Sequence, residues 1–482
     1  MTVAVDPYLT PGLDEVRELA REHNLVPLRH TFIADCETPV SAYLKLRGAG
    51  PSFLLESADP GQRVGRWSFL GFRPRKTLRK ALGDDPDPYA VVSSELARYR
   101  IAPLEGLPPF AGGAVGLFGY DLARSAEASV GPPNPDEAGI PDLALMVTDL
   151  MVAFDHLRHE VTVLANVFAE DDLERSYEQA ATAIAEVKEL LAGPVPQLGT
   201  GRQEPPEFFS NLGPDGYAAA VERAIEYIHA GDAYQVVPSQ RWTANCPVEA
   251  FSIYRGLRAI NPSPYMYFLD FEDFQIAGAS PESLVKVGGD RVELRPIAGT
   301  RPRTGSDAGL ADDLLGDPKE RAEHVMLVDL GRNDLGRVCE YGSVQVEELM
   351  AVETYSHVIH IVSSVSGRLR DGVTPMDALR ATLPAGTLSG APKIRAMQII
   401  DELEPVKRGP YGGAVGYLSY TGDLDTCINI RATFVRDGKA YLQAGGGIVA
   451  DSDPAYENRE AEAKAGAVME AIRLACAQPD WP

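Results

Sequence analysis

The stretch YMYFLDFEDFQIAGASPESLVKVGGDRVELRPI, residues 265–297, decides the fold class. It contains four short runs rich in apolar and β-prone residues, separated by acidic or glycine-containing turns. Strands joined by turns this short pair antiparallel, because a parallel pair needs a crossover of a dozen residues or more. The stretch therefore predicts an antiparallel sheet.

The same pattern recurs on both sides of this stretch. Residues 143–168 form two apolar runs around a polar turn at 155–160, and residues 428–444 form two runs around Arg436-Asp437-Gly438. Helical periodicity is expected at 217–230, 318–330, 392–403 and 454–476, three of which start with proline. The class is α+β: large antiparallel sheets covered by helices.

Composition limits the domain organisation and the partners. With 482 residues and 45% hydrophobic content, the chain is long enough for two or three domains. Its formal charge of −24 repels nucleic acids and anionic membranes. No signal peptide or apolar run of about 18 residues is found, so a cytoplasmic location is expected. The five dispersed cysteines argue against disulfides or a thiolate zinc site.

A segment rich in Gly, Pro and Gln divides the chain. We predict an N-terminal domain at 1–191, a linker at 192–216 and a catalytic domain at 217–476. The string GGAVG occurs twice, at 112–116 and 412–416. Chance could explain this repeat; our structural interpretation is two similar sheet halves packed face to face.

Two predicted helices carry paired carboxylates that suit a metal ion. Glu320 and Glu323 are three residues apart, as are Glu457 and Glu460, and Lys464 continues the second face. The two pairs could share one Mg²⁺, which prefers carboxylate oxygens, water and an anionic substrate. In a chain this acidic, a solvated helix face is the competing explanation.

Other candidate groups are ambiguous when taken singly. The loop GTLSGAPK, residues 386–393, could receive an anion or simply cap a helix, and it lacks Walker spacing. His360 lies in a strand-like run, where a hydrogen-bonded core histidine competes with a catalytic one. No cysteine sits in a nucleophile elbow, so no glutaminase chemistry is expected within this chain.

Together these segments resemble the chorismate-utilising enzymes, and most closely their anthranilate synthase large subunits. The similarity extends in order from Gly231 to Lys464. It comprises GDAYQVV (231–237), NPSPYM (261–266), SPE (280–282), RPIAGTRPR (295–303), ERAEH (320–324), LVDLGRND (327–334), GTLSGAPK (386–393), YGGAVGY (411–417), DTCINIR (425–431), QAGGG (443–447) and the carboxylate pair with Lys464. The family fold implied is a pair of antiparallel sheets packed as a sandwich with helices outside.

The resemblance implies a role for each residue. Glu282 would be the general acid, and His360 would serve pyruvate elimination, either by orienting the substrate or by taking the ring proton. The remaining residues fall into three groups: the magnesium set Glu320, Glu323, Glu457 and Glu460; the enolpyruvyl-carboxylate set Tyr411, Arg431, Gly445 and Gly447; and the substrate-positioning set Gly299, Thr300, Thr387 and Lys464.

Two positions bear on the reaction that the resemblance implies. Members that add water carry lysine where this chain has Gln235, and an amide cannot deprotonate water. Members that make 4-amino-4-deoxychorismate typically carry a lysine nucleophile where this chain has Ala298. Anthranilate synthase is favoured, with 2-amino-2-deoxyisochorismate synthase, or 4-amino-4-deoxychorismate synthase component I, as the alternatives.

The resemblance also implies regulation and a partner. The residues that match a tryptophan feedback site are Glu56, Ser57, Asn261, Pro264, Tyr265, Met266, Val415 and Tyr417. Ammonia would come from a glutamine amidotransferase subunit in a heterotetramer, or from free ammonium. A regulatory module without catalysis is the competing class, but it has no reason to keep all five glutamates of the predicted acid and metal sites.

Overall fold

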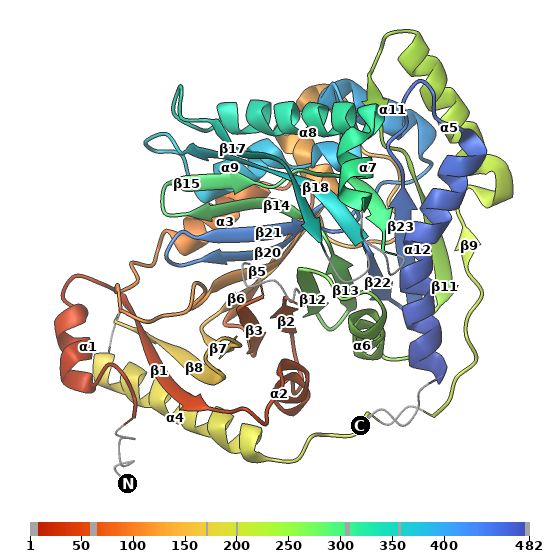
Figure 1. Ribbon diagram of the computed structural model, residues 1–482. Coiled ribbons are helices and arrows are strands. Elements are labelled where there is room, and N and C mark those ends of the chain that lie inside the picture. The colour runs from red at the N-terminus through yellow and green to blue at the C-terminus, as the bar shows by residue number, and fades with distance from the viewer. Residues whose placement is uncertain are drawn as a thin grey trace.

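The structure is a computed structural model that describes residues 8–57, 65–169, 172–198, 201–303, 309–354 and 358–477. Two large sheets dominate these residues, and every strand pair in them is antiparallel (Figure 1). The first sheet has the order β1 (Leu25–Ile33), β8 (Glu160–Phe168), β7 (Leu150–Asp155), β3 (Trp67–Phe72), β2 (Ser52–Glu56), β12 (Tyr265–Asp270), β13 (Phe274–Ser280), β22 (Ala432–Arg436), β23 (Lys439–Gly445), β11 (Ser239–Asn245) and β9 (Phe209–Ser210).

The second sheet contains the remaining strands of residues 265–297. Its order is β16 (Ile297–Pro302), β18 (Val358–Arg368), β15 (Arg291–Leu294), β14 (Ser283–Gly288), β21 (Leu424–Ile428), β20 (Ala414–Ser419), β5 (Gly113–Phe118), β6 (Leu143–Thr148) and β4 (Lys76–Lys80), with β17 (Gln345–Thr354) also on β18. Stretch 265–297 therefore crosses from one sheet to the other between β13 and β14. A small separate pair joins β10 (Gln235–Val236) to β19 (Gly390–Ala391).

The two sheets pack face to face through an aromatic and aliphatic core. Phe53, Phe69 and Tyr267 of the first sheet meet Val115 and Val415 of the second in one buried cluster. Each sheet buries its other face under helices, so the chain forms a sandwich with helices outside. The predicted α+β class is confirmed.

Helices α2 (Pro39–Leu46), α4 (Leu173–Ala192), α6 (Ala250–Ile260) and α12 (Pro454–Ala477) cover the first sheet, and α3 (Pro88–Leu96), α7 (Leu310–Gly316), α8 (Pro318–Gly336) and α9 (Pro375–Thr382) cover the second (Figure 1). The other helices are α1 (Leu13–Leu19), α5 (Gly213–His229), α10 (Gly386–Ser389) and α11 (Lys393–Leu403), with short 3₁₀ helices at Tyr120–Ser125 and Ala128–Val130. Asp317 caps α8 by accepting from two backbone N–H groups, and Pro318 occupies the first turn, where a missing donor costs nothing.

The two copies of GGAVG are arranged differently from our prediction. Its two copies lie in the same sheet, where β5 pairs with β20 and Gly116 stands opposite Gly416. The interpretation as sheet halves packed face to face is therefore wrong. A Cβ atom on Gly116 would lie 2.1 Å from the carbonyl oxygen of Ala144, and one on Gly416 would lie 2.1 Å from that of Asp425. The repeated glycines thus serve close backbone approach within one sheet.

Segments 1–191 and 217–476 both contribute strands to both sheets. Between them, α4 ends at Ala192 and α5 begins at Gly213, with only β9 in the described part of the interval. Within the described residues, no helix is long and apolar enough to span a bilayer.

Candidate functional site

A carboxyl and a hydroxyl form the centre of the candidate active site. Glu282 leaves the turn between β13 and β14, and Thr387 lies on α10. The Thr387 hydroxyl donates to Glu282 Oε1 over 3.0 Å. Burial raises the pKa of Glu282 to about 7, although the Thr387 hydrogen bond opposes this shift. Near neutral pH, the protonated form of Glu282 is therefore accessible, which a general acid requires.

Behind this pair lies a small cavity of about 50 Å³. Thr387, Glu282 and Asp334 line it together with Arg295. Asp334 pairs with Lys393 over 2.8 Å, which ties α8 to the loop that carries Thr387. The loop at 386–393, predicted to receive an anion, is thus held in place by the ion pair of Lys393 with α8.

Gln235 connects the β10 strand to the first carboxylate pair. Its side chain is buried, and its Nε2 donates to Glu323 Oε1 over 3.3 Å. Its Oε1 accepts from no described residue. A Cβ atom on Gly447 would lie 2.5 Å from Gln235 Nε2, so a larger residue there would displace the Gln235 amide. Gln235 thus lies between Glu323 of the predicted magnesium set and Gly447 of the set predicted to bind the enolpyruvyl carboxylate.

In each carboxylate pair, one glutamate meets a cation. Arg301 donates to Glu320 over 2.9 Å, and Lys464 lies 2.6 Å from Glu460. Burial raises the pKa values of the other two glutamates, Glu323 and Glu457, and the neighbouring carboxylate of each pair adds to that effect.

Carboxylate oxygens are the ligands that a hard divalent cation prefers, and burial disfavours the charged forms of Glu323 and Glu457 when no such cation is bound. Among the described residues, no three His, Cys, Asp or Glu side chains lie close enough together to hold a metal ion. Ligands from substrate and water would therefore have to complete the coordination.

The backbone of Gly299, a predicted substrate residue, orients His360. Its Nδ1 lies 3.0 Å from the carbonyl oxygen of Gly299, which can only accept a hydrogen bond. The proton therefore sits on Nδ1, and burial lowers the pKa of the ring, which favours the neutral form. Gly299 itself approaches Glu320, because a Cβ atom there would lie 3.0 Å from Glu320 Oε2. The side chain of the predicted substrate residue Thr300 lies outside the described part of the chain.

Cationic and aromatic groups form a cradle opposite these acids. Arg431 follows β21 with a φ of +52°, a strained conformation for a side chain of this size. Its guanidinium lies near Tyr411 and Glu460, and burial lowers its pKa. Lys464 donates to the carbonyl oxygen of Gly445 over 3.0 Å. The structure thus brings the predicted carboxylate-binding residues together beside the second carboxylate pair.

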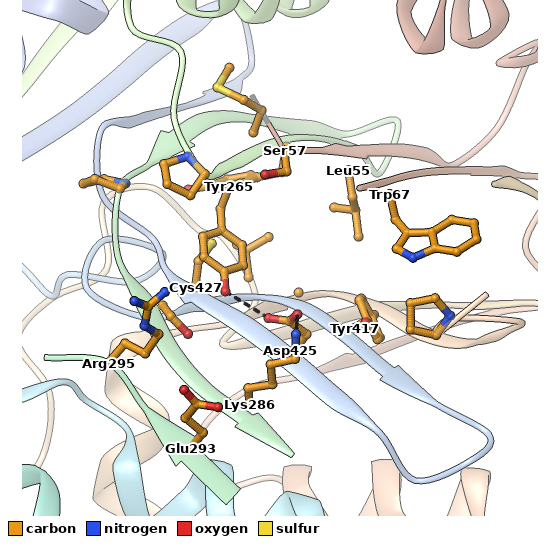
Figure 2. Close-up of a pocket in the computed structure, with 18 of the residues that line it drawn as sticks. Leu55, Ser57, Trp67, Tyr265, Lys286, Glu293, Arg295, Tyr417, Asp425 and Cys427 are labelled. Carbon is orange, nitrogen blue, oxygen red and sulfur yellow. Dashed lines mark hydrogen bonds and ion pairs between the residues drawn. The ribbon is translucent and has the colours of Figure 1, made fainter. Parts of the chain in front are cut away.

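A much larger cavity, of about 940 Å³, opens between the two sheets. Seven of the eight residues predicted for an effector site line it: Glu56, Ser57, Pro264, Tyr265, Met266, Val415 and Tyr417. Figure 2 shows Leu55, Ser57 and Trp67 on one side of this space and Tyr417 and Asp425 on the other, with Tyr265 between them. The Ser57 hydroxyl is buried and has no partner among the described residues.

Two of the predicted effector residues act less directly. Asn261 does not line the cavity; it caps α6 and leads into β12. The Glu56 carboxylate is bound by the Tyr254 hydroxyl and lies 3.3 Å from Arg258, both on α6. The charge of Glu56 is therefore already compensated. Glu56 lies at the end of β2 and lines the cavity there.

Sequence reasoning missed several polar groups in this cavity. Asp425 accepts from the Tyr265 hydroxyl over 3.1 Å and pairs with Lys286 over 3.1 Å (Figure 2). The available signal was the alternation of polar and apolar residues along β14 and β21, which points Lys286 and Asp425 to the same side. Arg295 and Ser283 line both cavities, so a single wall separates them.

A carboxyl with a raised pKa, a buried arginine beside a tyrosine, and two carboxylate pairs form an arrangement suited to acid–base chemistry on an anionic substrate. A family model described as chorismate binding enzyme matches residues 50–470. The chain belongs to this family of chorismate-binding enzymes.

Individual relatives show which members of this family the chain resembles. The chain is 49% identical to anthranilate synthase component 1 of Pseudomonas putida over 484 residues, which cover 95% of this chain and 98% of that protein. It is 44% identical to the protein of the same name from Aquifex aeolicus, with 97% and 98% covered.

Two solved structures share the fold. Anthranilate synthase component I from Streptococcus pneumoniae matches with a TM-score of 0.77 and 41% identity, covering 91% of this chain and 99% of that one. The menaquinone-specific isochorismate synthase of Escherichia coli matches with a TM-score of 0.71 at 19% identity, covering 96% and 99%, and shows the fold alone.

Proposed function

We propose that this chain is the aminase subunit of an anthranilate synthase, which converts chorismate and ammonia to anthranilate and pyruvate in tryptophan biosynthesis. The observation that carries this proposal is the buried Gln235 amide beside Glu323, at the position where water-adding members have a lysine base. The Gln235 amide cannot activate water, and Ala298 offers no nucleophile. Ammonia, which needs no deprotonation before attack, then remains as the nucleophile.

The first chemical step requires a proton for the departing ring hydroxyl. Glu282 supplies it while ammonia attacks two carbons away, so that the hydroxyl leaves as water. Thr387 fixes the Glu282 carboxyl with its hydrogen bond. The raised pKa of Glu282, about 7, keeps the acid form available near neutral pH.

The second step removes a ring proton and expels enolpyruvate as pyruvate, which leaves an aromatic ring. In our proposal His360 takes that proton at Nε2, and this role is supported by the hydrogen bond from its Nδ1 to Gly299, which leaves Nε2 without a proton. Arg431 and Tyr411, with the backbone at Gly445 and Gly447, hold the enolpyruvyl carboxylate, the arginine through a charge-assisted contact.

Glu323 and Glu460, with Glu320 and Glu457 nearby, are the residues that would hold magnesium. When bound, Mg²⁺ would neutralise the ring carboxylate of the substrate and stabilise charge that develops during the reaction. These four glutamates would otherwise repel a dicarboxylate substrate.

We further propose that the 940 Å³ cavity binds tryptophan as a feedback inhibitor. Tyr417, whose ring lies tilted against that of Phe110 at a centroid distance of 4.6 Å, offers an aromatic wall for an indole ring. The buried Ser57 hydroxyl offers a hydrogen bond to the amino-acid end of the ligand. A cytoplasmic location and a heterotetramer with a glutamine amidotransferase subunit complete the proposal.

The decisive experiment is to incubate the purified chain with chorismate, magnesium chloride and ammonium, and to identify the products by chromatography with mass detection. Anthranilate with an equal amount of pyruvate is expected. An aminated product that keeps the enolpyruvyl group would reassign the chain to an aminodeoxyisochorismate or aminodeoxychorismate synthase. Tryptophan binding without any turnover would instead identify a regulatory module.

A further inference from the structure

Arg408 is among the largest fully buried side chains of the molecule, and it lies next to the candidate active site. Its Nη1 donates to the carbonyl oxygen of Leu388 over 2.5 Å, and its Nη2 donates to that of Val237 over 2.6 Å. Both Nε and Nη2 also donate to Glu404, at 3.0 and 2.6 Å. One guanidinium thus binds two main-chain carbonyls and one carboxylate.

Each of these contacts belongs to a segment that carries a residue of the proposed mechanism. Leu388 follows Thr387 on α10, and Val237 lies two residues after Gln235. Arg408 itself precedes Tyr411 by three residues, and its guanidinium lies 5.5 Å from the centre of the Tyr411 ring. Three segments that are far apart in the sequence therefore meet at one side chain.

The carboxylate partner is itself fixed. Glu404 Oε1 accepts from both the backbone N–H and the hydroxyl of Ser239, each over 2.8 Å. On its other side, Arg408 lies over Tyr120, 4.6 Å from the ring centre. A buried ion pair offsets its desolvation cost only when its geometry is good and further hydrogen bonds support it, and the contacts of Arg408 to Leu388 and Val237 supply such bonds.

The planar guanidinium is required by this arrangement. Its donors point in fixed, divergent directions, which lets a single group bind Leu388, Val237 and Glu404 at once. A lysine ammonium at the same place keeps the charge, but it is a compact point charge without that fork. The shape of the cation, rather than its charge alone, sets the relative position of the three segments.

We propose that Arg408 is a positioning residue, which sets Thr387, Gln235 and Tyr411 at their working distances without touching the substrate. This inference rests on the proposed function, because those three residues act on chorismate only if the chain is a chorismate aminase. Its geometric content, the joining of three segments by one side chain, can be tested separately.

The first test measures backbone hydrogen exchange by mass spectrometry on the full chain. The Val237 N–H donates to the carbonyl oxygen of Ser389 over 3.0 Å, and it reports on the contact between two of the segments. Arg408→Lys is expected to raise exchange at least about tenfold in peptides covering 235–238 and 386–391, and to leave peptides from β2 and β20 unchanged. Unchanged exchange in both active-site peptides would overturn the proposal.

The second test separates positioning from general destabilisation. In Arg408→Lys, kcat for chorismate is expected to fall about 30-fold and KM to rise about tenfold, because both the acid and the carboxylate cradle move. A loss of folded protein alone would lower the apparent kcat and leave KM unchanged, which would contradict positioning. The wild-type products decide the proposed function independently, whereas exchange in the variant decides the role of Arg408.

Two further variants complete the design. Ser239→Ala removes one hydrogen bond from Glu404 and should reproduce the change in exchange and KM more weakly, which keeps the proposal testable if Arg408→Lys fails to fold. Lys45→Met is the matched control: Lys45 also binds one carboxylate, Glu37, and one main-chain carbonyl, that of Leu191, but in the N-terminal segment. It should leave KM and active-site exchange unchanged.

Discussion

The two cavities of this protein differ in how they are built. The larger cavity, about 940 Å³, which we call the effector cavity after its proposed role, lies between two sheets and is lined mainly by strand residues. The space behind Glu282 is about 50 Å³, and its walls come from α8, α10 and the ends of strands. The first is preformed by rigid elements, whereas the second is nearly filled by side chains that hold each other in place.

Their charge also differs. In the effector cavity, Asp425 is paired with Lys286, and Glu56 lies against Arg258. In the active site, Glu323 and Glu457 carry pKa values raised by burial and by a neighbouring carboxylate. The comparison teaches that Asp425 and Glu56 of the larger cavity are each paired with a cation, whereas burial disfavours the charged forms of Glu323 and Glu457. Ser283 and Arg295 line both cavities, so the larger cavity shares a wall with the small space behind Glu282 and Thr387.

The strongest way to test this contrast is Glu323→Gln. We expect turnover to fall by about 10³-fold or more, because bound metal stabilises developing charge by several kcal/mol. Added magnesium should not restore turnover, and calorimetry should show weakened magnesium binding. Tryptophan binding should stay within twofold of the wild type.

The matched control is Glu462→Gln, an exposed glutamate on α12. It should keep full activity. Near-full activity of Glu323→Gln would remove Glu323 from the metal set and, with it, the contrast in charge between the two sites.

Glu282→Gln should have the next largest effect, a fall in kcat of about 10²- to 10⁴-fold, because a general acid is lost. The same change should stabilise the fold at high pH. The folded-state pKa of Glu282, about 7, lies above its ordinary value of 4.5, so wild-type stability declines as the pH rises from 4.5 to 7. Above that window, the ionised, partly buried carboxylate costs about 3 kcal/mol.

Denaturant unfolding at pH 5 and pH 8.5 measures this difference. The variant should exceed the wild type in stability only at pH 8.5. Equal stability differences at both pH values would show that Glu282 does not carry the raised pKa.

Ser57→Ala addresses the effector cavity. The hydroxyl is buried without a described partner, so a bound ligand would gain a hydrogen bond of about 1 to 2 kcal/mol. The inhibition constant for tryptophan should rise about 5- to 30-fold, with the uninhibited rate within twofold of the wild type. Met266→Thr, which reshapes the apolar wall, should act in the same direction. Ser94→Ala, on an exposed helix position, is the control, and an unchanged inhibition constant in both cavity variants would refute the effector assignment.

The sequence predicted the sheets and the main helices well because both depend on local patterns. Short apolar runs with tight turns determine antiparallel pairing, and the starts of α8 and α12 at Pro318 and Pro454 follow from local rules. It did not predict that the run at 143–155 divides at Asp149, with β6 in one sheet and β7 in the other. That division depends on which partner strand each half meets, and no local signal encodes it.

For the site, motif similarity gave the candidate acid, metal and carboxylate-binding residues, which the fold brings close together. It gave no role to Arg408, Arg295 or Asp425, because their importance lies in contacts between distant segments. Arg408 stands in a run of small and polar residues beside Tyr411, where an arginine most often looks like a surface charge. Only the folded structure shows that it is buried.

The smallest expected effect, and the most specific, is that of Thr387→Val. The Thr387 hydroxyl donates to Glu282 and thereby opposes the rise of its pKa. Without this donor the carboxyl keeps its proton to higher pH, so the descending limb of kcat/KM should move about one pH unit upward, as expected for a hydrogen bond to a charged group. The profile must be measured at constant free ammonia, since ammonia itself titrates. Thr387→Ser retains the hydroxyl and should keep the wild-type limb. If the valine variant loses activity while the descending limb of kcat/KM stays in place, Thr387 acts on the substrate rather than on Glu282. The side chains of the active site would then depend less on one another than the comparison with the effector cavity implies.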